Sequence, residues 1–215
     1  MAQPASNTSS NLLIIVSAPS GGGKTTLCQA LLEANPETVV RAITCTTRAP
    51  RPGEKDGVDY YFLDAADFLK RVQAGNFLEH ATVHGNSYGT LKSEVLNKLR
   101  QGKDVLLNID VQGAASIRSK AESDEDIRKA LVTVFLAPPS LAVLGERLKK
   151  RDSDSPANIQ KRLSVARHEI AQWKNFDYLI ISNTVQNDLD MLTGIITAEK
   201  LRQTRAKLPD YGREG

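Results

Sequence analysis

The feature that most constrains this chain is a glycine-rich loop that follows a short apolar run and precedes a helical pattern. Residues 12–16 are all aliphatic, residues 20–25 read Ser-Gly-Gly-Gly-Lys-Thr, and apolar side chains then recur with helical spacing up to Asn35. A short, continuously apolar strand is typical of a parallel sheet that helices cover on both faces. The order strand, glycine loop, helix therefore predicts an α/β fold with a phosphate-binding loop, or P-loop.

The residue types in this loop suit a nucleoside triphosphate. Glycines let backbone N–H groups converge on a phosphate, and the helix N-terminus adds a partial positive charge. Lys24 is expected to reach the β- and γ-phosphates, and the Thr25 hydroxyl is expected to bind Mg²⁺. Ala18 stands where the full consensus has a glycine, but this change removes no donor that a phosphate needs. The candidate ATP-binding residues of the loop are Ser20, Gly21, Gly22, Gly23, Lys24, Thr25 and Thr26.

Further apolar runs and helical patterns extend this core. The predicted strands cover residues 105–109, 132–136 and 178–181, and the predicted helices include residues 90–101, 141–150 and 189–205. Another helix is predicted to begin with Ser155 as its N-cap and Pro156 in its first position, where a missing N–H costs nothing. Together these elements predict a P-loop NTPase core with a parallel sheet flanked by helices.

Two stretches differ in amino-acid composition from this core. Residues 38–92 are rich in Thr, Arg, Pro, Gly and Tyr, and we expect them to form an insertion that faces a ligand. Residues 137–162 contain prolines, a basic run and the segment Asp-Ser-Asp-Ser, and we expect a mobile lid there. The core is then predicted to comprise residues 12–37, 93–136 and 163–207, with flexible tails at 1–11 and 208–215.

Composition excludes several classes of function. The chain has 28 Lys and Arg against 25 Asp and Glu, and the resulting net charge of +3 is too small to indicate nucleic-acid binding. No apolar run approaches the roughly 18 residues that a membrane span needs, and the N-terminal residues do not resemble a signal peptide. Cys28 and Cys45 lack the spacing of a metal site or a disulfide framework. We therefore expect a cytoplasmic protein that acts on small molecules, without nucleic-acid or membrane partners; the sequence does not determine its oligomeric state.

The most distinctive passage covers residues 44–62. Arg48 and Arg51 lie three residues apart, and Pro50 and Pro52 stiffen the backbone around them. Two planar guanidinium groups held close together suit a phosphate dianion, and without an anion they would repel each other. The passage therefore predicts an acceptor site for a phosphorylated ligand.

This passage resembles the GMP-binding signature of guanylate kinases. The resemblance continues through Asn76-Phe77-Leu78-Glu79, Gly85-Asn86-Ser87-Tyr88-Gly89-Thr90 and Ile109-Asp110-Val111-Gln112-Gly113, and it spans most of the chain. Several motifs in the right order are more specific than any one of them. The resemblance implies a nucleoside monophosphate kinase that transfers the γ-phosphoryl group of ATP to GMP, with Mg²⁺ as cofactor, in purine nucleotide metabolism and GMP recycling.

The resemblance also assigns residues to the GMP site. It implies that Arg48, Arg51, Tyr60 and Tyr88 bind the GMP phosphate and that Thr44, Glu79, Thr90 and Asp110 lie around the guanine. Chemistry supports Glu79 independently, because an ionised carboxylate only accepts hydrogen bonds and guanine offers two adjacent donors, its N1–H and its 2-amino group. Adenine lacks this pair of donors, so it would leave the carboxylate unpaired and be rejected.

Arginines in the predicted lid match the family pattern as well. The resemblance implies that Arg151 and Arg162 contact the donor phosphates when the lid closes, and that Asn183 lies near the adenine of ATP. Charge on the transferred phosphoryl group is spread over its oxygens, so catalysis depends on positioning and electrostatics, and we assign no general base. Asn108 stands where the family often has an acid, and we assign it no metal contact. The expected catalytic residues are Lys24, Arg48, Arg151 and Arg162.

Two other interpretations fit parts of the sequence. The first is a P-loop kinase that acts on AMP or on a pyrimidine monophosphate, although Glu79 and residues 44–60 argue against it. The second is a protein-binding module, because guanylate-kinase-like domains in scaffolds hold a phosphopeptide in the acceptor pocket. Those modules typically have degraded P-loops, whereas Lys24 and Thr25 are intact here. A panel of acceptor nucleotides distinguishes these interpretations.

Overall fold

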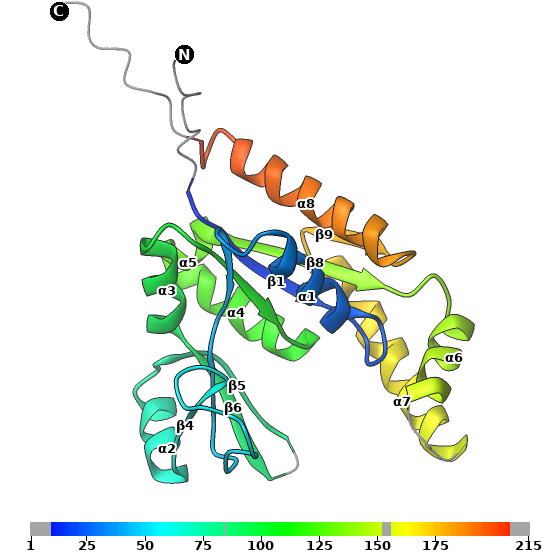
Figure 1. Cartoon of the computed structure of the whole chain (residues 1–215), viewed down its shortest axis with the longest axis horizontal. Helices are drawn as coiled ribbons and strands as arrows, with labels where there is room; N and C mark the ends of the chain where they lie inside the picture. Colours follow the sequence, from blue (N-terminus) through cyan, green and yellow to red (C-terminus); the bar gives the residue numbers. More distant parts are fainter. Residues whose placement is uncertain (1–9, 84, 152–155, 207–215) are drawn as a thin grey trace, which may run out of the picture.

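The core of the protein is a parallel five-stranded sheet. The computed structural model describes residues 10–83, 85–151 and 156–206, with only the backbone of residues 150, 151, 156 and 157. The strand order is β2-β7-β1-β8-β9, and each neighbouring pair is parallel (Figure 1). The strands are β1 (Leu13–Ser17), β2 (Val39–Arg41), β7 (Asp104–Asn108), β8 (Leu131–Ala137) and β9 (Tyr178–Ile181). This sheet and its flanking helices confirm the predicted α/β fold.

Alternate residues of a strand point to opposite faces of the sheet, so an apolar strand exposes apolar side chains on both faces, and helices cover both. Leu12, Ile14 and Val16 share one apolar cluster with helices α1 and α8. Leu13 and Ile15 belong to the cluster on the other face, which α3, α4 and α5 cover. Burial on both faces explains why residues 12–16 are continuously apolar. The bounds of these helices are α1 (Lys24–Ala34), α3 (Lys92–Arg100), α4 (Val111–Ser123), α5 (Glu125–Ala130) and α8 (Val185–Leu201).

A second sheet with four strands lies beside the core, at the lower left of Figure 1. Its order is β4-β3-β6-β5; β3 pairs in parallel with β4 and antiparallel with β6, which pairs antiparallel with β5. Helix α2 packs on it through a small apolar cluster that includes Cys45, Phe68 and Phe77. The elements are β3 (Thr44–Thr46), β4 (Tyr60–Phe62), α2 (Ala65–Gln73), β5 (Phe77–Val83) and β6 (Asn86–Leu91).

The strand β2 lies within the range 38–92 that the sequence assigned to the insertion, yet it pairs with β7 at the edge of the core sheet. A strand of three residues is too short to show a periodic pattern, so the sequence did not separate it from the residues that follow. The chain crosses to the second sheet through Ala42 and Ile43, and it returns where β6 ends and α3 begins at Lys92. These two crossings define the insertion as residues 42–91.

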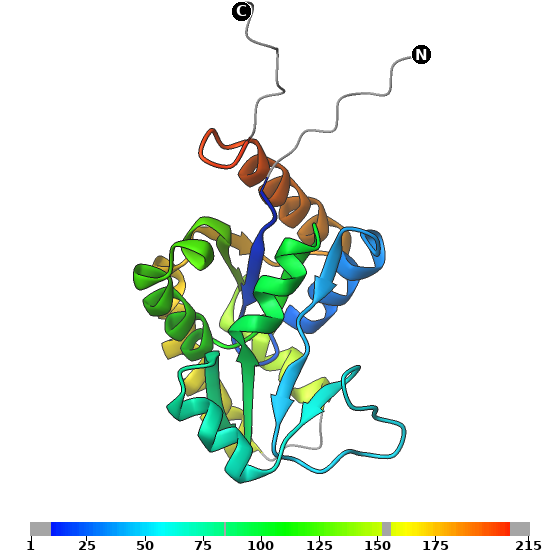
Figure 2. The same cartoon turned by 90° about the vertical axis from the view of Figure 1, so that its left-hand side faces the viewer.

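Helices α6 (Leu141–Arg151) and α7 (Pro156–Ala171) lie side by side beyond the end of β8 and run in opposite directions (Figure 1). Leu144, Leu148 and Ala166 form a small apolar cluster between them. Helix α7 continues past residue 162, where the lid was predicted to end, and leads through η1 (Gln172–Asn175) to β9. In Figures 1 and 2 the insertion and these two helices lie on the side of the core that faces away from α8. The predicted N-cap Ser155 lies outside the described residues.

The last helix begins earlier than the sequence predicted. Helix α8 starts at Val185, because the Thr184 side chain caps it by accepting a hydrogen bond from the Asn187 N–H at 3.2 Å. It ends at Leu201, four residues before the predicted end at Arg205. Within the described ranges, none of the helices combines the length and the apolar character needed to span a membrane.

Candidate active site

The P-loop joins β1 to α1 and forms the wall of a pocket. Gly21 and Gly23 have φ angles of +83° and +96°, in the left-handed region that glycine adopts without a steric penalty. The Gly22 N–H donates to the Pro19 carbonyl at 2.8 Å and closes a tight turn. The enclosed pocket has a volume of about 290 Å³, and Asp110 and Glu169 complete its lining. Every predicted loop residue from Ser20 to Thr25 lines it.

Lys24 lies at this pocket in the first turn of α1. Its Nζ donates to the backbone carbonyl of Ile109, just beyond β7, at 2.8 Å. Burial lowers the pKa of Lys24, and the nearby Asp110, Cys28 and Glu169 act in the opposite direction. The bond therefore holds a largely desolvated ammonium group between the P-loop and the end of β7, where it can meet a phosphate.

Thr25 offers an exposed hydroxyl beside the same pocket. The Asn108 amide lies 3.5 Å from its Oγ1. Among the residues that the structure describes, no cluster of three His, Cys, Asp or Glu side chains is able to hold a metal ion. A single hydroxyl next to a phosphate pocket nevertheless fits Mg²⁺, which in nucleotide sites takes few protein ligands and completes its shell with phosphate oxygens and water.

A second pocket, of about 300 Å³, shares Gly21 and Gly23 with the P-loop. Thr26, predicted to bind ATP, lines this pocket together with Asn183, predicted to lie near adenine. The Asn183 N–H donates to the Asp188 carboxylate at 2.8 Å, which fixes the turn between β9 and α8. The structure therefore brings Asn183 to the P-loop although the two lie far apart in the sequence.

Arg48 and Arg51 meet at a carboxylate. The Arg48 guanidinium donates to both carboxylate oxygens of Glu54, at 2.8 and 2.9 Å, and the Arg51 backbone N–H donates to Glu54 at 2.7 Å. The Arg51 N–H is the largest contribution that lowers the pKa of Glu54, and the bond from Arg48 acts in the same direction. The Arg51 side chain itself is exposed. The Glu54 carboxylate thus forms a bidentate pair with the Arg48 guanidinium, whereas the convergence of both arginine side chains on a phosphate stays a prediction.

Two predicted tyrosines surround the same arginine. The Arg48 guanidinium lies 5.4 Å from the centre of the Tyr60 ring, and the Tyr60 and Tyr88 rings lie 6.3 Å apart, edge to face. Thr44 on β3 stands opposite Tyr60 on β4 in the strand register. The second sheet therefore gathers Arg48, Tyr60 and Tyr88 into one cluster that combines a cation with two hydroxyl groups.

Glu79 is a buried carboxylate at the junction of the second sheet with the core. A β-bulge after Phe77 brings Glu79 opposite Thr90, and the Thr90 hydroxyl donates to Glu79 Oε1 at 2.7 Å. The close pairing of β5 with β6 here requires Gly89, since a Cβ at that position would lie 2.9 Å from the Phe77 ring. Only 8% of Glu79 is exposed, and its burial raises its pKa, while the Thr90 bond lowers it and the charge of Asp110 raises it.

Asp110 connects the two halves of the site. It caps α4 by accepting from the Gly113 N–H at 2.8 Å, and it lines the P-loop pocket. The charge of this one carboxylate just beyond β7 therefore acts on both the P-loop residue Lys24 and the buried Glu79.

The predicted lid arginines lie on separate helices. Arg151 is the last residue of α6, and its side chain lies outside what the structure describes. Arg162 lies in α7 and is half-buried. The two positions share one helical pair, but their convergence on donor phosphates stays a prediction.

The model of the guanylate kinase family matches residues 10–199. The chain belongs to the guanylate kinase family. It is 45% identical to the guanylate kinase of Coxiella burnetii over 191 residues, 89% of each chain, and 40% identical to that of Thermotoga maritima over 193 residues, 90% and 89% of the two chains. A crystal structure of guanylate kinase from Anaplasma phagocytophilum matches with a TM-score of 0.68 and 32% identity, over 93% and 92% of the two chains.

Members of this family are nucleoside monophosphate kinases, and the chain is accordingly a phosphotransferase. Arg147 lies beside the P-loop, and the sequence did not single it out. Its guanidinium lies 3.4 Å from the Gly22 carbonyl and 3.4 Å from the Ser182 hydroxyl, and it lines the pocket that holds Asn183. The signal was its position one helical turn before Arg151, which puts both on the same face of α6.

Glu169 was also missed. Its Oε2 accepts from the Ser20 N–H of the P-loop at 3.3 Å, and it lines the P-loop pocket. Burial raises its pKa, the Ser20 bond lowers it, and Asp110 raises it further. Nothing in a single sequence distinguishes this glutamate from an ordinary polar position of α7, because the contact spans 149 residues.

Proposed function

We propose that this kinase transfers the γ-phosphoryl group of ATP to GMP, producing ADP and GDP. The observation that carries the proposal is the buried Glu79. A carboxylate has two oxygens and about four acceptor positions, and the Thr90 hydroxyl uses one of them at Oε1. The remaining capacity matches the N1–H and 2-amino donors of guanine. An acceptor base without these donors would leave a desolvated charge unpaired, which is strongly unfavourable.

We propose that the P-loop pocket takes the donor phosphates and that the adjoining pocket takes the adenosine. Backbone N–H groups of the loop and the Lys24 ammonium supply the positive field. Thr25 is the proposed ligand of Mg²⁺, which when bound neutralises charge on the β- and γ-phosphates. The proposed ATP-binding residues are Ser20, Gly21, Gly22, Gly23, Lys24, Thr25, Thr26, Arg147 and Asn183.

We propose that the GMP phosphate takes the place of the Glu54 carboxylate on Arg48. A phosphate dianion carries more charge and more acceptor oxygens than a carboxylate, so it competes well for a bidentate guanidinium. Arg51, Tyr60 and Tyr88 complete the phosphate site, and Thr44, Glu79, Thr90 and Asp110 surround the guanine. The insertion, residues 42–91, is therefore the proposed GMP-binding unit.

The proposed lid comprises α6 and the first part of α7. Its closure would bring Arg151 and Arg162 to the transferred phosphoryl group and exclude water, which otherwise competes with GMP as acceptor. Together with Lys24 and Arg48 these are the proposed catalytic residues, and they act through charge and position. We place the reaction in the cytoplasm, in purine nucleotide metabolism, where ATP and GMP are both present.

The experiment measures ADP release from MgATP with GMP, AMP, CMP, UMP and dTMP, for the parent and for Glu79→Ala. We expect activity with GMP alone, reduced about 100-fold or more in kcat/KM in the variant, because two charged hydrogen bonds are lost. Glu125→Ala is the control, since Glu125 is exposed on α5 and pairs with the surface residue Lys129 at 2.7 Å. Equal activity of the parent with AMP and GMP would contradict the assignment of the acceptor.

A further inference from the structure

One carboxylate joins the insertion to the core. Glu94 lies in the first turn of α3, and its side chain is only 11% exposed. Its Oε1 accepts from the Ile43 N–H at 3.0 Å and lies 3.3 Å from the Lys98 ammonium. Its Oε2 accepts from the Tyr61 hydroxyl at 3.1 Å. A largely desolvated carboxylate with a partner on each oxygen holds those partners in fixed positions.

The partners of Glu94 come from the segments where the chain passes between core and insertion. Ile43 belongs to the two-residue link between β2 of the core sheet and β3 of the second sheet. Helix α3 itself begins directly after β6, at the return crossing. Glu94 therefore ties the outgoing crossing to the returning one.

Tyr61 extends this connection to the phosphate-binding side of the insertion. It is the middle residue of β4, a strand of three residues at the outer edge of the second sheet. Neighbouring residues of a strand point to opposite faces. With Tyr61 bonded to Glu94 on one face, Tyr60 on the other face lies against Arg48 and Tyr88.

The hydroxyl of Tyr61 is a stable donor at neutral pH. Burial raises its pKa, and the charge of Glu94 and its hydrogen bond raise it further. As an edge strand, β4 pairs with one neighbour, and the bonds from the Phe62 N–H to Asp56 at 2.9 Å and from the Gly57 N–H to the Tyr60 carbonyl at 2.8 Å restrain it locally. The bond from Tyr61 to Glu94 differs from these because it ties β4 to a helix of the core.

We propose that Glu94 and Tyr61 are positioning residues for the acceptor: they hold β4 and the base of the insertion so that Tyr60 and Arg48 meet the GMP phosphate in register. The inference rests on the proposed function of this site. Neither residue contacts the nucleotide in this account, and both act through Tyr60. Their loss is expected to weaken GMP binding while it leaves the donor site intact.

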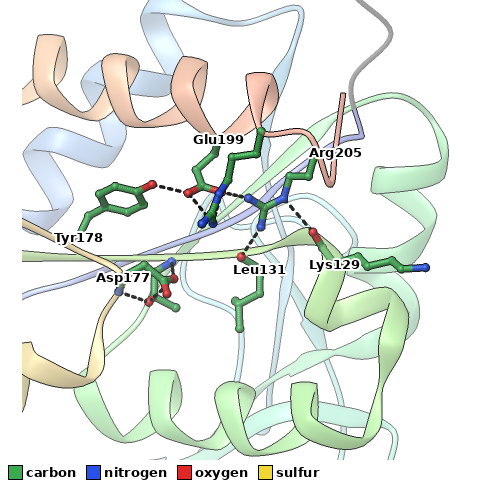
Figure 3. Close-up of polar contacts among 8 residues, drawn as sticks. Lys129, Leu131, Asp177, Tyr178, Glu199 and Arg205 are labelled. Atoms are coloured by element: carbon green, nitrogen blue, oxygen red, sulfur yellow. Dashed lines mark hydrogen bonds and ion pairs between the residues drawn. The ribbon is translucent and has the colours of Figure 1, made fainter. Parts of the chain in front are cut away.

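The test compares two tyrosine variants that each remove the hydroxyl that donates to a glutamate. Tyr61→Phe removes the donor to Glu94, and Tyr178→Phe removes the donor to Glu199 on α8, on the far side of the core (Figure 3). Both variants keep the aromatic ring and lose one hydrogen bond. Tyr178→Phe therefore shows how much of any change in Tyr61→Phe comes from a general loss of stability. KM for GMP, KM for ATP, kcat, and the Kd of GMP from calorimetry are measured for each.

We expect Tyr61→Phe to raise KM and Kd for GMP about tenfold, because a small misplacement in a binding site has a large effect, with KM for ATP within about twofold of the parent. Tyr178→Phe is expected to leave both constants within about twofold. Equal GMP constants in Tyr61→Phe and the parent would overturn the positioning role. If the parent itself neither binds nor phosphorylates GMP, the proposed function fails instead, so the two failures are distinguishable.

A second pair of variants separates positioning from a simple packing defect. Glu94→Ala removes every bond of the carboxylate, whereas Glu94→Gln keeps its size and can still accept from the Ile43 N–H while its amide bonds the Tyr61 oxygen. Glu94→Ala is expected to raise the Kd of GMP at least as much as Tyr61→Phe does. Glu94→Gln is expected to restore most of the affinity. Equal GMP affinity in the alanine variant and the parent would count against the inference.

Discussion

At the scale of single residues, the site depends on charges held out of water. Glu79 is 8% exposed, and its burial raises its pKa above the usual value of 4.5. The ionised form is therefore unfavourable in the folded protein before guanine supplies its donors. The proposed base selectivity of Glu79 therefore comes at some expense in stability, a common relation at functional sites.

The direction of the pKa shift of Glu79 gives a prediction for Glu79→Gln. Because the folded-state pKa is raised, the protonated form contributes stability that is present below pH 4.5 and lost as the pH rises through the folded-state pKa. Glutamine stays uncharged, so the variant is expected to have a higher Tm than the parent at pH 7.5 and a similar Tm near pH 4. Its kcat/KM for GMP is expected to fall about 100-fold. Thermal unfolding from pH 4 to 8 measures the first effect, and a Tm below that of the parent at pH 7.5 would contradict it.

Single residues were predictable from the sequence where a motif gives them a chemical reason. Lys24 follows the glycines of a phosphate loop, and Arg48 lies three residues from Arg51. Glu94 and Glu169 were not predictable, because their partners lie 51 and 149 residues away and only the fold brings them together. A long-range hydrogen bond leaves no pattern in the sequence around it.

At the scale of elements, helix α6 of the proposed lid is coupled to the P-loop by packing. A Cβ at Gly21 would lie 2.9 Å from Leu148 of α6, so the loop and the helix are in close contact. Helix α6 carries Arg147 at the donor pocket and ends at Arg151. A shift of α6 would therefore move the loop and the arginines together.

The lid arginines give a second prediction. Arg151→Ala and Arg162→Ala are each expected to lower kcat about 100-fold or more, because each removes a charge that acts on the transition state. The Kd of GMP should stay near that of the parent. Lys149→Ala is the control, as Lys149 belongs to the same basic run but is exposed and pairs with Glu146 at 2.8 Å. If either arginine variant kept kcat within about twofold of the parent, its role in transfer would be disproved.

Among the elements, the core strands β1, β7, β8 and β9 were predictable because their runs are largely apolar. Strands β1, β7 and β8 are buried along most of their length, whereas Leu179 and Ile181 of the edge strand β9 are 40% and 50% exposed. The short strands β2 and β4 were not, since three residues carry no periodic signal. The start of α8 was misplaced because the capping role of Thr184 was not recognised. A short strand is recognised only when the strand it pairs with is known, and a helix start only when the capping hydrogen bond is known.

At the scale of the whole molecule, a polar cluster fastens the C-terminal end of α8 to the sheet (Figure 3). Glu199 is 2% exposed and bonds Tyr178 and Arg205, and Arg205 also donates to the carbonyls of Lys129 and Leu131 at 2.9 Å. The Ser10 N–H donates to the Arg205 carbonyl at 3.1 Å. The cluster therefore joins both ends of the described chain far from the nucleotide pockets.

This cluster predicts a stability effect without a catalytic one. Glu199→Ala leaves the Arg205 charge buried and uncompensated, and it is expected to lower the free energy of unfolding by about 3–5 kcal/mol. Arg202→Ala is the comparison, because Arg202 bonds the same Glu199 at 3.2 Å but is itself 63% exposed, so its loss leaves Glu199 still paired with Arg205 and is expected to cost at most about 1 kcal/mol. Urea unfolding measures both. A loss of under about 1 kcal/mol in Glu199→Ala, or a large loss in kcat for the folded variant, would contradict this account.

The most direct test of the central claim is a competition for limiting MgATP. GMP, AMP, CMP, UMP and dTMP are mixed in equal amounts with the enzyme, and the nucleoside diphosphates formed are separated by anion-exchange chromatography. The account predicts that GDP and ADP appear in equal amounts and that the other diphosphates are absent. Phosphorylation of a pyrimidine nucleotide, or ADP in excess of what GDP formation from GMP explains, would contradict the reading of Glu79 as the group that selects guanine.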